Sequence, residues 1–306
     1  MSEPRSPVLP YLAFTGLGLI WGASFLFIKI GVHDMSPTTL ALIRSASGAV
    51  TLGVVLLAMR RPLFGADWRR RIPLFLFLAL FNAVLPWSAI AWGEQHISSG
   101  LASILNSTTT LWAAILVYWA VPNERPSSLN YVGVLIGLAG VVILVLPDIS
   151  AHGITGSFLG ALAVVSASIS YAVSALFQRL RLKGMSVYEQ SFGQLAFSAL
   201  VALPVAAPSL PSLHFAWVSM GAVIALGVGG SGIAYLLYYY SMNTLGAVRA
   251  TGVTFVVPIT AVFWGVVLLH ESLSVSVVVG MIVILGGVVL TNLRRRPRAV
   301  AATRAA

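Results

Sequence analysis

Residues 190–248 read QSFGQLAFSALVALPVAAPSLPSLHFAWVSMGAVIALGVGGSGIAYLLYYYSMNTLGAV and contain no Asp, Glu, Lys or Arg. An α-helix rises about 1.5 Å per residue and the hydrocarbon layer of a membrane is about 30 Å thick, so about 20 apolar residues cross it once. The prolines Pro204, Pro208 and Pro211 divide the stretch into two such helices. The sequence here predicts two consecutive membrane crossings.

The composition of the whole chain indicates a membrane protein. Of the 306 residues, 58% are hydrophobic and only 8% are charged, whereas a soluble domain carries roughly 25% charged residues. The polar residues are too few to cover a soluble enzyme. The chain contains no cysteine, which excludes disulfides, thiolate metal sites and thiol nucleophiles.

Ten apolar runs, bounded by Gly, Pro and charged residues, predict ten transmembrane helices. The first run resembles a signal peptide, but it has a counterpart in the second half of the chain, so we interpret it as a span. The predicted spans are 10–31, 37–59, 71–92, 99–121, 130–147, 155–178, 187–207, 214–242, 247–270 and 274–292.

The basic residues predict the orientation. If the N-terminus is cytoplasmic, fifteen of the 18 Lys and Arg residues lie in cytoplasmic segments and none lies in an outer loop. Short basic loops resist translocation. We therefore expect a multi-pass protein of the bacterial inner membrane with both termini in the cytoplasm. The net charge of +10 then reflects topology, and we expect no nucleic-acid partner.

An internal repeat divides the chain into residues 8–147 and 154–293, followed by a basic cytoplasmic tail, 294–306. Each repeat has five spans, an odd number, so the two repeats must have opposite orientations. Such inverted repeats are typical of transporters, whose substrate sites lie near the membrane midplane where the repeats meet. The matching pairs include Ser24 with Ser174, Lys29 with Arg179, Arg44 with Gln194, Glu124 with Glu271 and Gly133 with Gly280.

The motifs of the second half resemble the EamA pattern of the drug/metabolite transporter superfamily. They occur in the order Ala234-Tyr235, Leu245-Gly246-Ala247, Val257-Pro258-Ile259, His270-Glu271-Ser272-Leu273-Ser274 and Gly286-Gly287-Val288. The resemblance implies a ten-helix inverted-repeat carrier, and within the superfamily the chain most resembles the YddG-type bacterial amino-acid exporters. It departs from that pattern where Leu111 replaces the proline of the repeat and where Arg249 replaces Ala102.

Polar and aromatic residues deep in the spans are candidates for lining a substrate cavity. Trp21 and Ser24 share one helix face, as do Tyr171 and Ser174 in the equivalent helix. The alternative is that these residues join helices or form an interfacial aromatic belt. The cavity candidates are Trp21, Ser24, Asn82, Asn106, Tyr171, Ser174, Gln178, Tyr235 and Tyr239.

Two further candidates have a functional and a structural interpretation. Arg44 lies roughly 10 Å below the outer boundary, where it would contact a substrate carboxylate or be a snorkelled or paired structural residue. Pro258, in the middle of the ninth span, is a hinge or a packed kink.

The remaining charged groups near span ends have structural interpretations. We expect Glu124 and Glu271 to cap the helices that follow them. Lys29 and Arg249 lie near span ends, where their side chains would snorkel to the interface.

No acidic residue falls in the middle third of a predicted span, which favours a facilitator over proton coupling. We expect an exporter of amino acids, aromatic and other small neutral ones, and of related metabolites, working as a monomer by alternating access without metal or cofactor. The alternative is a multidrug exporter of hydrophobic organic cations such as viologens. The histidines lie near span ends or in loops, which argues against an intramembrane enzyme.

Overall fold

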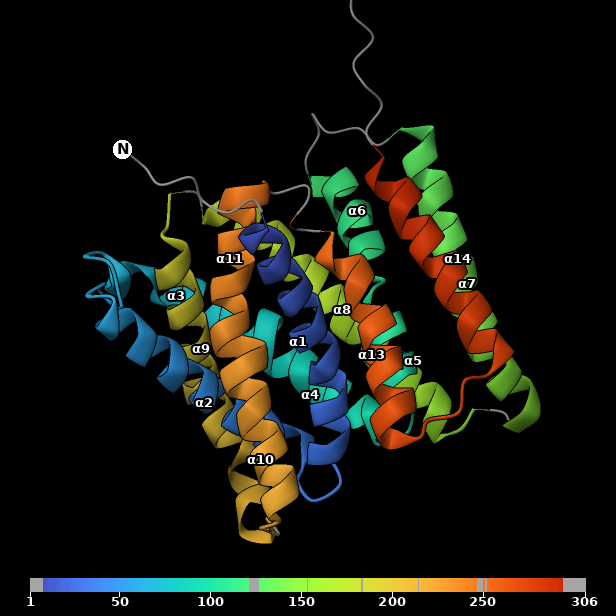
Figure 1. Ribbon diagram of the computed structural model, residues 1–306, viewed down its shortest axis with the longest axis horizontal. Helices are drawn as coiled ribbons and strands as arrows, with labels where there is room; N and C mark the ends of the chain where they lie inside the picture. The colour runs from blue at the N-terminus through green and yellow to red at the C-terminus, as the bar shows by residue number, and fades with distance from the viewer. Residues whose placement is uncertain are drawn as a thin grey trace, which may run out of the picture.

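A computed structural model describes residues 8–120, 127–152, 154–182, 184–213, 215–246, 250 and 252–293. These residues form a bundle of helices joined by short connections (Figure 1). The helices are α1 (Leu9–Gly31), α2 (Pro37–Ala58), η1 (Trp68–Arg71), α3 (Ile72–Ala79), η2 (Leu80–Val84), α4 (Leu85–Glu94), α5 (Ser99–Asn106), α6 (Thr109–Ala120), α7 (Ser128–His152), α8 (Gly156–Arg181), α9 (Val187–Ala206), η3 (Ala207–Ser212), α10 (Trp217–Ala225), η4 (Leu226–Ile233), α11 (Ala234–Leu245), α13 (Val253–Leu269) and α14 (Val275–Asn292).

These helices supply the predicted spans. Within the described residues, nine helical units are long and apolar enough to cross a membrane, and α13 is a shorter apolar helix of 17 residues. The composite units are Trp68–Glu94, Ser99–Ala120, Val187–Pro211 and Trp217–Leu245. The expectation of an all-helical, multi-pass membrane protein is confirmed.

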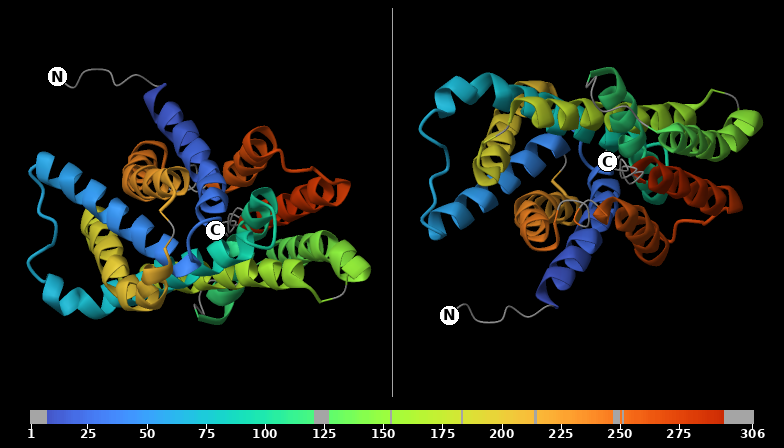
Figure 2. Two further views of the ribbon diagram at one scale, coloured as in Figure 1. Left: turned by 90° about the horizontal axis from the view of Figure 1, so that it is seen from below. Right: turned by 90° about the horizontal axis from the view of Figure 1, so that it is seen from above.

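The helices of each half pack mainly against helices of the other half. The first span, α1, packs against α13 and against α10 and α11, and its counterpart α8 packs against α6 and α4. In the same way α2 packs on α9, while α7 packs on α14 at one edge of the bundle (Figures 1 and 2). This reciprocity is the pattern that two halves related by a two-fold axis would give.

Three predicted spans are interrupted, which the apolar pattern alone does not indicate. The third span contains a π-helical segment, η2, and the eighth contains another, η4, at a corresponding position in the second half. In the fourth span the hydroxyls of Ser107 and Thr108 donate to the carbonyls of Ile104 and Leu105 at 2.6 Å. Local hydroxyl-to-carbonyl bonds of this kind compete with the helix ladder, and a turn separates α5 from α6 there.

The predicted end of the fifth span is wrong. We placed the end of the fifth span at Pro147, but α7 continues through this proline to His152. A proline inside a membrane helix is tolerated when neighbouring groups compensate for the missing backbone donor. The ninth span, predicted from residue 247, contains α13, which begins at Val253 directly after its N-cap residue Gly252. Residues 247–249 and 251 lie outside the described part of the chain.

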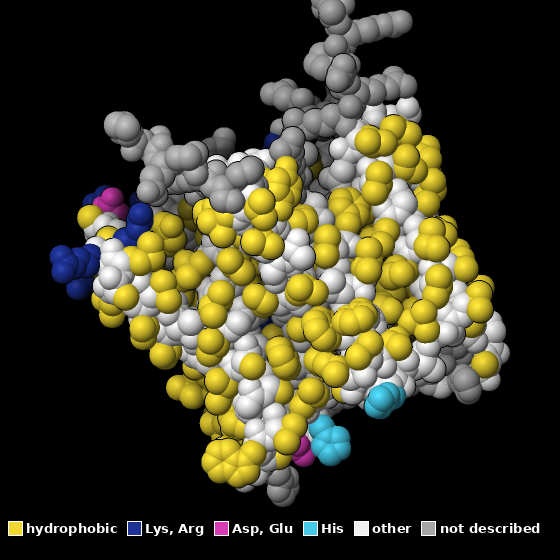
Figure 3. Space-filling model, in the orientation of Figure 1, with side chains coloured by type: hydrophobic (Ala, Val, Ile, Leu, Met, Phe, Trp, Pro, Cys, Tyr) yellow, Lys and Arg dark blue, Asp and Glu magenta, His cyan; other side chains and the backbone are white. Residues whose placement is uncertain are grey.

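The two ends of the bundle differ in charge. We call one end the basic end because it carries Arg60, Arg61, Arg69, Arg70 and Arg71 between α2 and α3, with Arg179 and Arg181 at the end of α8. The opposite end, which we call the distal end, carries Asp34, Glu94 and Glu271. Figure 3 shows apolar side chains over the visible lateral surface, arginines and lysines at one edge and histidines at the opposite end. The apolar belt between two polar ends fits a membrane-spanning bundle.

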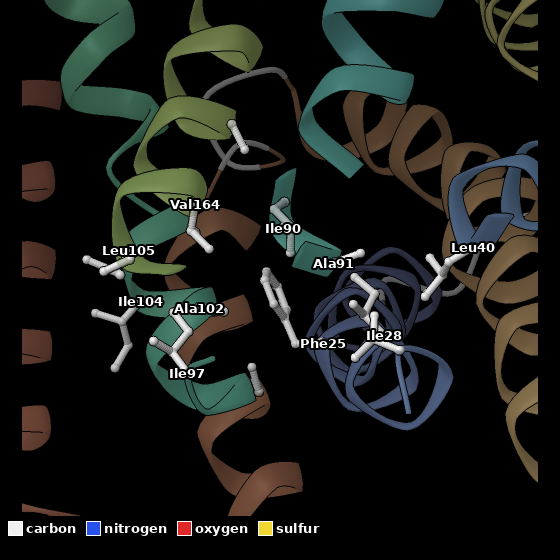
Figure 4. Close-up of a cluster of buried hydrophobic side chains, with 14 of the residues drawn as sticks. Phe25, Ile28, Leu40, Ile90, Ala91, Ile97, Ala102, Ile104, Leu105 and Val164 are labelled. Carbon is white, nitrogen blue, oxygen red and sulfur yellow. The ribbon is translucent and has the colours of Figure 1, made fainter. Parts of the chain in front are cut away.

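A core of buried apolar side chains occupies the half of the bundle towards the distal end. Phe25, Ile28, Leu40 and Ile90 pack there with Ile97, Leu105 and other residues from α4, α5 and α8 (Figure 4). Each of these six side chains is buried. The core therefore seals the distal half and leaves open space in the other half.

Small residues set the spacing of two helix pairs. A Cβ atom added to Gly22 would lie 2.0 Å from Thr260 Oγ1, and one added to Gly287 would lie 2.4 Å from the backbone nitrogen of Gly137. Backbones that approach this closely need glycine at the contact. The small-residue pairs in α1 and α7 thus pack helices from different halves together.

Candidate functional site

A cavity of about 490 Å³ lies where the two halves meet. This volume is in the range of small-molecule sites, which is roughly 300–1,000 Å³. Its walls come from both halves of the chain, including α1, α2, α4, α8, α11 and α13. Lining residues such as Gln190 and Thr254 lie within a turn of helix ends at the basic end. The cavity therefore extends from the middle of the bundle towards the basic end, while the distal core closes its other side.

The structure brings most of the predicted candidates together. The lining includes Trp21, Ser24, Arg44, Asn82, Asn106, Tyr171, Gln178, Tyr235, Tyr239 and Pro258. Ser174 is the exception, because it is fully buried and accepts a hydrogen bond from Gln178 Nε2 at 3.2 Å. Positions three apart on a helix differ by about 60° in direction, so sharing a face with Tyr171 did not place Ser174 in the cavity.

Arg44 is held by neutral groups. Its side chain is only 8% exposed, its Nε donates to Ser231 Oγ at 3.1 Å, and its guanidinium carbon lies 3.9 Å from the centre of the Trp87 ring. Within the described residues no carboxylate forms an ion pair with it. The guanidinium is neither snorkelled to a membrane boundary nor neutralised by an acid, and it faces the cavity.

Trp87 was missed by the sequence analysis. It follows Pro86 at the start of α4 and is 3% exposed, with its ring forming the support for Arg44. The only signal was a tryptophan in the middle of a predicted span, which equally suits packing. A pairing of cation and indole face contributes about 2 kcal/mol or more when both are desolvated.

A chain of amide and hydroxyl groups crosses between the halves on one wall. Asn82 Nδ2 donates to Gln194 Oε1, and Gln194 Nε2 donates to the Tyr235 hydroxyl, each at 3.0 Å. These contacts join η2, α9 and α11. Because both amides have partners, their orientation is fixed, and the Tyr235 proton remains available as a donor towards the cavity.

Aromatic rings line the cavity next to this chain of polar groups. Trp21 Nε1 donates to the Gly230 carbonyl of η4 at 3.1 Å, and the Trp21 ring lies 5.5 Å from that of Tyr238. The rings of Tyr235 and Tyr239 are stacked with centres 6.5 Å apart. The glycine-rich sequence of η4 allows α1 to approach a main-chain carbonyl. These rings and polar groups together can bind a small solute with a flat apolar part and a hydrogen-bonding head.

Pro258 lies on the cavity wall next to a tight helix contact. The Thr260 hydroxyl, two residues on, donates to the Gly18 carbonyl of α1 at 2.9 Å. Pro258 itself is buried. The kink in α13 is thus packed against α1 in this conformation, and its role as a hinge remains a prediction.

Lys29 caps a helix at the distal end, which the sequence did not predict. Lys29 Nζ donates to the carbonyls of Glu94 and Ile97, at 2.5 and 2.9 Å, instead of snorkelling. A cation at the end of α4 interacts favourably with the helix dipole. Arg249, for which we also expected snorkelling, lies outside the described residues.

We expected Glu271 to cap the helix that follows it, and this was wrong because it caps α5. Its carboxylate accepts hydrogen bonds from Ser99 N at 2.7 Å, Ser99 Oγ at 3.0 Å and Gly100 N at 3.1 Å. It therefore caps α5 of the other half, while Ser274 caps α14. The left-handed backbone of His270, with φ of 54°, ends α13 just before the acid. Glu124, the repeat counterpart, lies outside the described residues.

Glu94 is an unexpected buried acid. Its side chain is 0% exposed, and neither carboxylate oxygen has a hydrogen-bond partner within the described residues. The sequence placed it beyond the end of a span, because the apolar run stops at Trp92. The structure extends that span to Glu94 and covers its side chain.

Comparisons with known proteins agree with this architecture. A model of the EamA-like transporter family matches residues 8–146 and again residues 158–293. The chain belongs to the EamA-like transporter family. The resemblance of the motifs to the EamA pattern is thus confirmed, and the chain is a membrane transporter by family.

Several relatives are transporters by name. The chain is 22% identical over 283 residues to the uncharacterized transporter YoaV of Bacillus subtilis, covering 92% of this chain and 96% of that protein. It is 28% identical over 292 residues to the uncharacterized inner membrane transporter YedA of Escherichia coli, covering 92% and 90%. A crystal structure with 20% identity superposes with a TM-score of 0.66 over 94% of this chain and 98% of that one, which shows a common fold.

Proposed function

We propose that this EamA-like protein exports amino acids, aromatic and other small neutral ones, and related metabolites across the bacterial inner membrane. It does so as a monomer by alternating access between two inverted five-helix repeats. With the basic end in the cytoplasm, the cavity is open to the cytoplasm and closed to the outside, as an exporter waiting for its substrate requires. The motifs of the sequence, which resemble those of YddG-type amino-acid exporters, favour the same substrate class.

Arg44 is the observation that carries the proposal. It is a buried cation inside an aromatic cavity whose described lining contains no Asp or Glu. A planar guanidinium recognises a carboxylate through parallel hydrogen bonds. The aromatic wall formed by Trp21, Tyr235 and Tyr239 suits an apolar side chain. A solute with a carboxylate head and an apolar body matches both features.

The alternative, a hydrophobic organic cation, is disfavoured by the same arginine. Two unit charges about 6 Å apart at an effective dielectric constant of about 20 repel by about 3 kcal/mol. That repulsion lowers affinity by more than 100-fold. A multidrug exporter of viologens would need an acid in the cavity or no charge at all.

Coupling to protons was not expected from the sequence, because acids were absent from the middle of the spans. The described residues that line the cavity include no Asp or Glu either. We therefore propose a facilitative exporter. Buried Glu94 lies outside the cavity lining and behind the distal core.

Flux into proteoliposomes tests the proposal. Labelled amino acids and methyl viologen are supplied to reconstituted protein, with and without a pH gradient. We expect amino-acid flux without viologen flux and without acceleration by the gradient. The combined Trp21→Ala and Tyr171→Ala variant should insert normally and lose most of the flux. Unchanged flux in this variant, or viologen flux alone, would reject the site or the substrate class.

A further inference from the structure

We propose that the cavity selects solutes with a net charge of −1 over zwitterions and cations, and that the membrane potential drives their efflux. This inference rests on the proposed function and ranks its substrates at the same site: related metabolites that carry −1 are preferred over the zwitterionic amino acids. It follows from the charges around the cavity and from the conformations that a carrier must pass through.

The cavity holds one fixed charge. Of its described lining residues, Arg44 alone is charged, and the polar remainder are neutral hydroxyl, amide and indole groups. Glu94 is the nearest candidate for a compensating acid. Its side chain does not line the cavity, and it lies at the end of α4 where Lys29 Nζ donates to its backbone carbonyl. Glu271 is occupied by the backbone of α5. The guanidinium charge is therefore available to the solute.

The contacts of Arg44 leave its carboxylate-binding edge available. Its Nε is bonded to Ser231 and its flat face rests on Trp87. Within the described part of the chain, its two terminal nitrogens have no hydrogen-bond acceptor. These nitrogens are the donors that take a carboxylate in the bidentate geometry. Ser231 and Trp87 thus hold the cation in place without neutralising it.

Alternating access passes through a state in which both ends of the bundle are closed. Any uncompensated charge sealed in that state is costly, because the cavity excludes bulk water. A monoanion paired with Arg44 leaves the sealed cavity neutral. A zwitterion leaves a charge of +1, and a cation leaves +2. The ranking of transport rates should therefore be monoanion, zwitterion and cation.

The membrane potential then supplies the driving force. The cell interior is negative, so a monoanion moves outward down the electrical gradient, while a zwitterion gains nothing from it. A potential of about 60 mV supports about a tenfold concentration ratio for one charge. Such a carrier needs no proton, which agrees with the absence of acids among the described lining residues.

Three solutes with the same aromatic body test the inference. N-acetylphenylalanine carries −1, phenylalanine is a zwitterion and phenethylamine carries +1. Their uptake into proteoliposomes is measured at neutral pH with potassium and valinomycin setting the potential, and protein-free liposomes report leakage. We expect initial rates at least tenfold higher for N-acetylphenylalanine than for phenylalanine. An inside-positive potential of about 60 mV should accumulate the anion about tenfold.

Variants at the arginine locate the effect. Arg44→Gln gives the cavity the residue that the repeat has at Gln194, and it should abolish the preference for the anion. Arg44→Lys keeps the charge and should retain the preference. Arg70→Gln removes an exposed arginine at the basic end and should leave the ranking unchanged. If neither Arg44 variant folds, the ranking and the response to potential in the wild-type protein still decide.

Each outcome separates the two claims. Phenylalanine flux equal to or faster than that of the anion, and independent of the potential, would overturn this inference while leaving the proposed amino-acid exporter intact. Flux of phenethylamine alone would reject the proposed function as well. Absence of flux for all three solutes would reject both.

Discussion

Replacing Glu271 by glutamine should open the distal end. The carboxylate of Glu271, in the second half, accepts three hydrogen bonds from Ser99 and Gly100 in the first half. Opening at this end must separate these groups. Hydrogen bonds to a charged group contribute about 1.5–3 kcal/mol each. Glutamine retains one acceptor oxygen and turns a donor towards the N–H groups of α5.

Losing one of the three bonds weakens distal closure by about 1.5–3 kcal/mol, which corresponds to a shift of about 10- to 160-fold in the equilibrium between closed and open states. The chain has no cysteine, so spin labels can be attached at introduced cysteines replacing Gln95 and Ser272, which are both exposed at this end. The distance between them is measured by double electron–electron resonance in nanodiscs. We expect a second, longer distance to appear in the Glu271→Gln variant.

A control on the same loop distinguishes this contact from general destabilisation. Ser274 caps α14 within one half, its Oγ accepting from Val277 N at 3.3 Å. Ser274→Ala should lower stability by about 1 kcal/mol and leave the distances unchanged. An unchanged distance distribution in Glu271→Gln, or an equal change in Ser274→Ala, would refute the role of Glu271 in closing the distal end.

Two further predictions concern stability. Gly22→Ala should prevent accumulation of folded protein, because the added methyl group would lie 2.0 Å from Thr260 Oγ1. Gly16→Ala on the same helix is the control: its methyl group would have nothing within 4 Å, so the change should be neutral or slightly stabilising. Thermal unfolding in detergent compares the two variants. Glu94→Gln should raise the unfolding temperature, since it removes a buried acid without hydrogen-bond partners, and a lower temperature would instead show that the carboxylate is paired with Lys29.

The spans could be predicted because the membrane imposes a length and a composition on them. Interruptions within spans could not. The π-helical segment η2 has an apolar sequence like its neighbours, and only Asn82 distinguishes it. The segment η4 did carry a signal in its four glycines, yet glycine also occurs in continuous membrane helices. What decides is the contact with Trp21 through the Gly230 carbonyl, which depends on tertiary packing.

The site was predictable to the extent that polar residues in spans avoid lipid. This rule brought Asn82, Tyr235 and Arg44 to attention, and all three line the cavity. It could not separate lining from packing, as Ser174 shows. The sequence also could not predict contacts between distant segments. The contact of Arg44 with Trp87 and the capping of α5 by Glu271 join residues more than 40 positions apart.

The exchange of partners between the halves has a consequence for biogenesis. When the ribosome has delivered α1 and α2 to the membrane, their main neighbours α13 and α9 are not yet synthesised. Arg44 then has no Ser231 to bind and Gly22 has no Thr260 to pack against. The contacts of α2 with α9 and of α1 with α13 therefore form only after the seventh and ninth spans have been inserted.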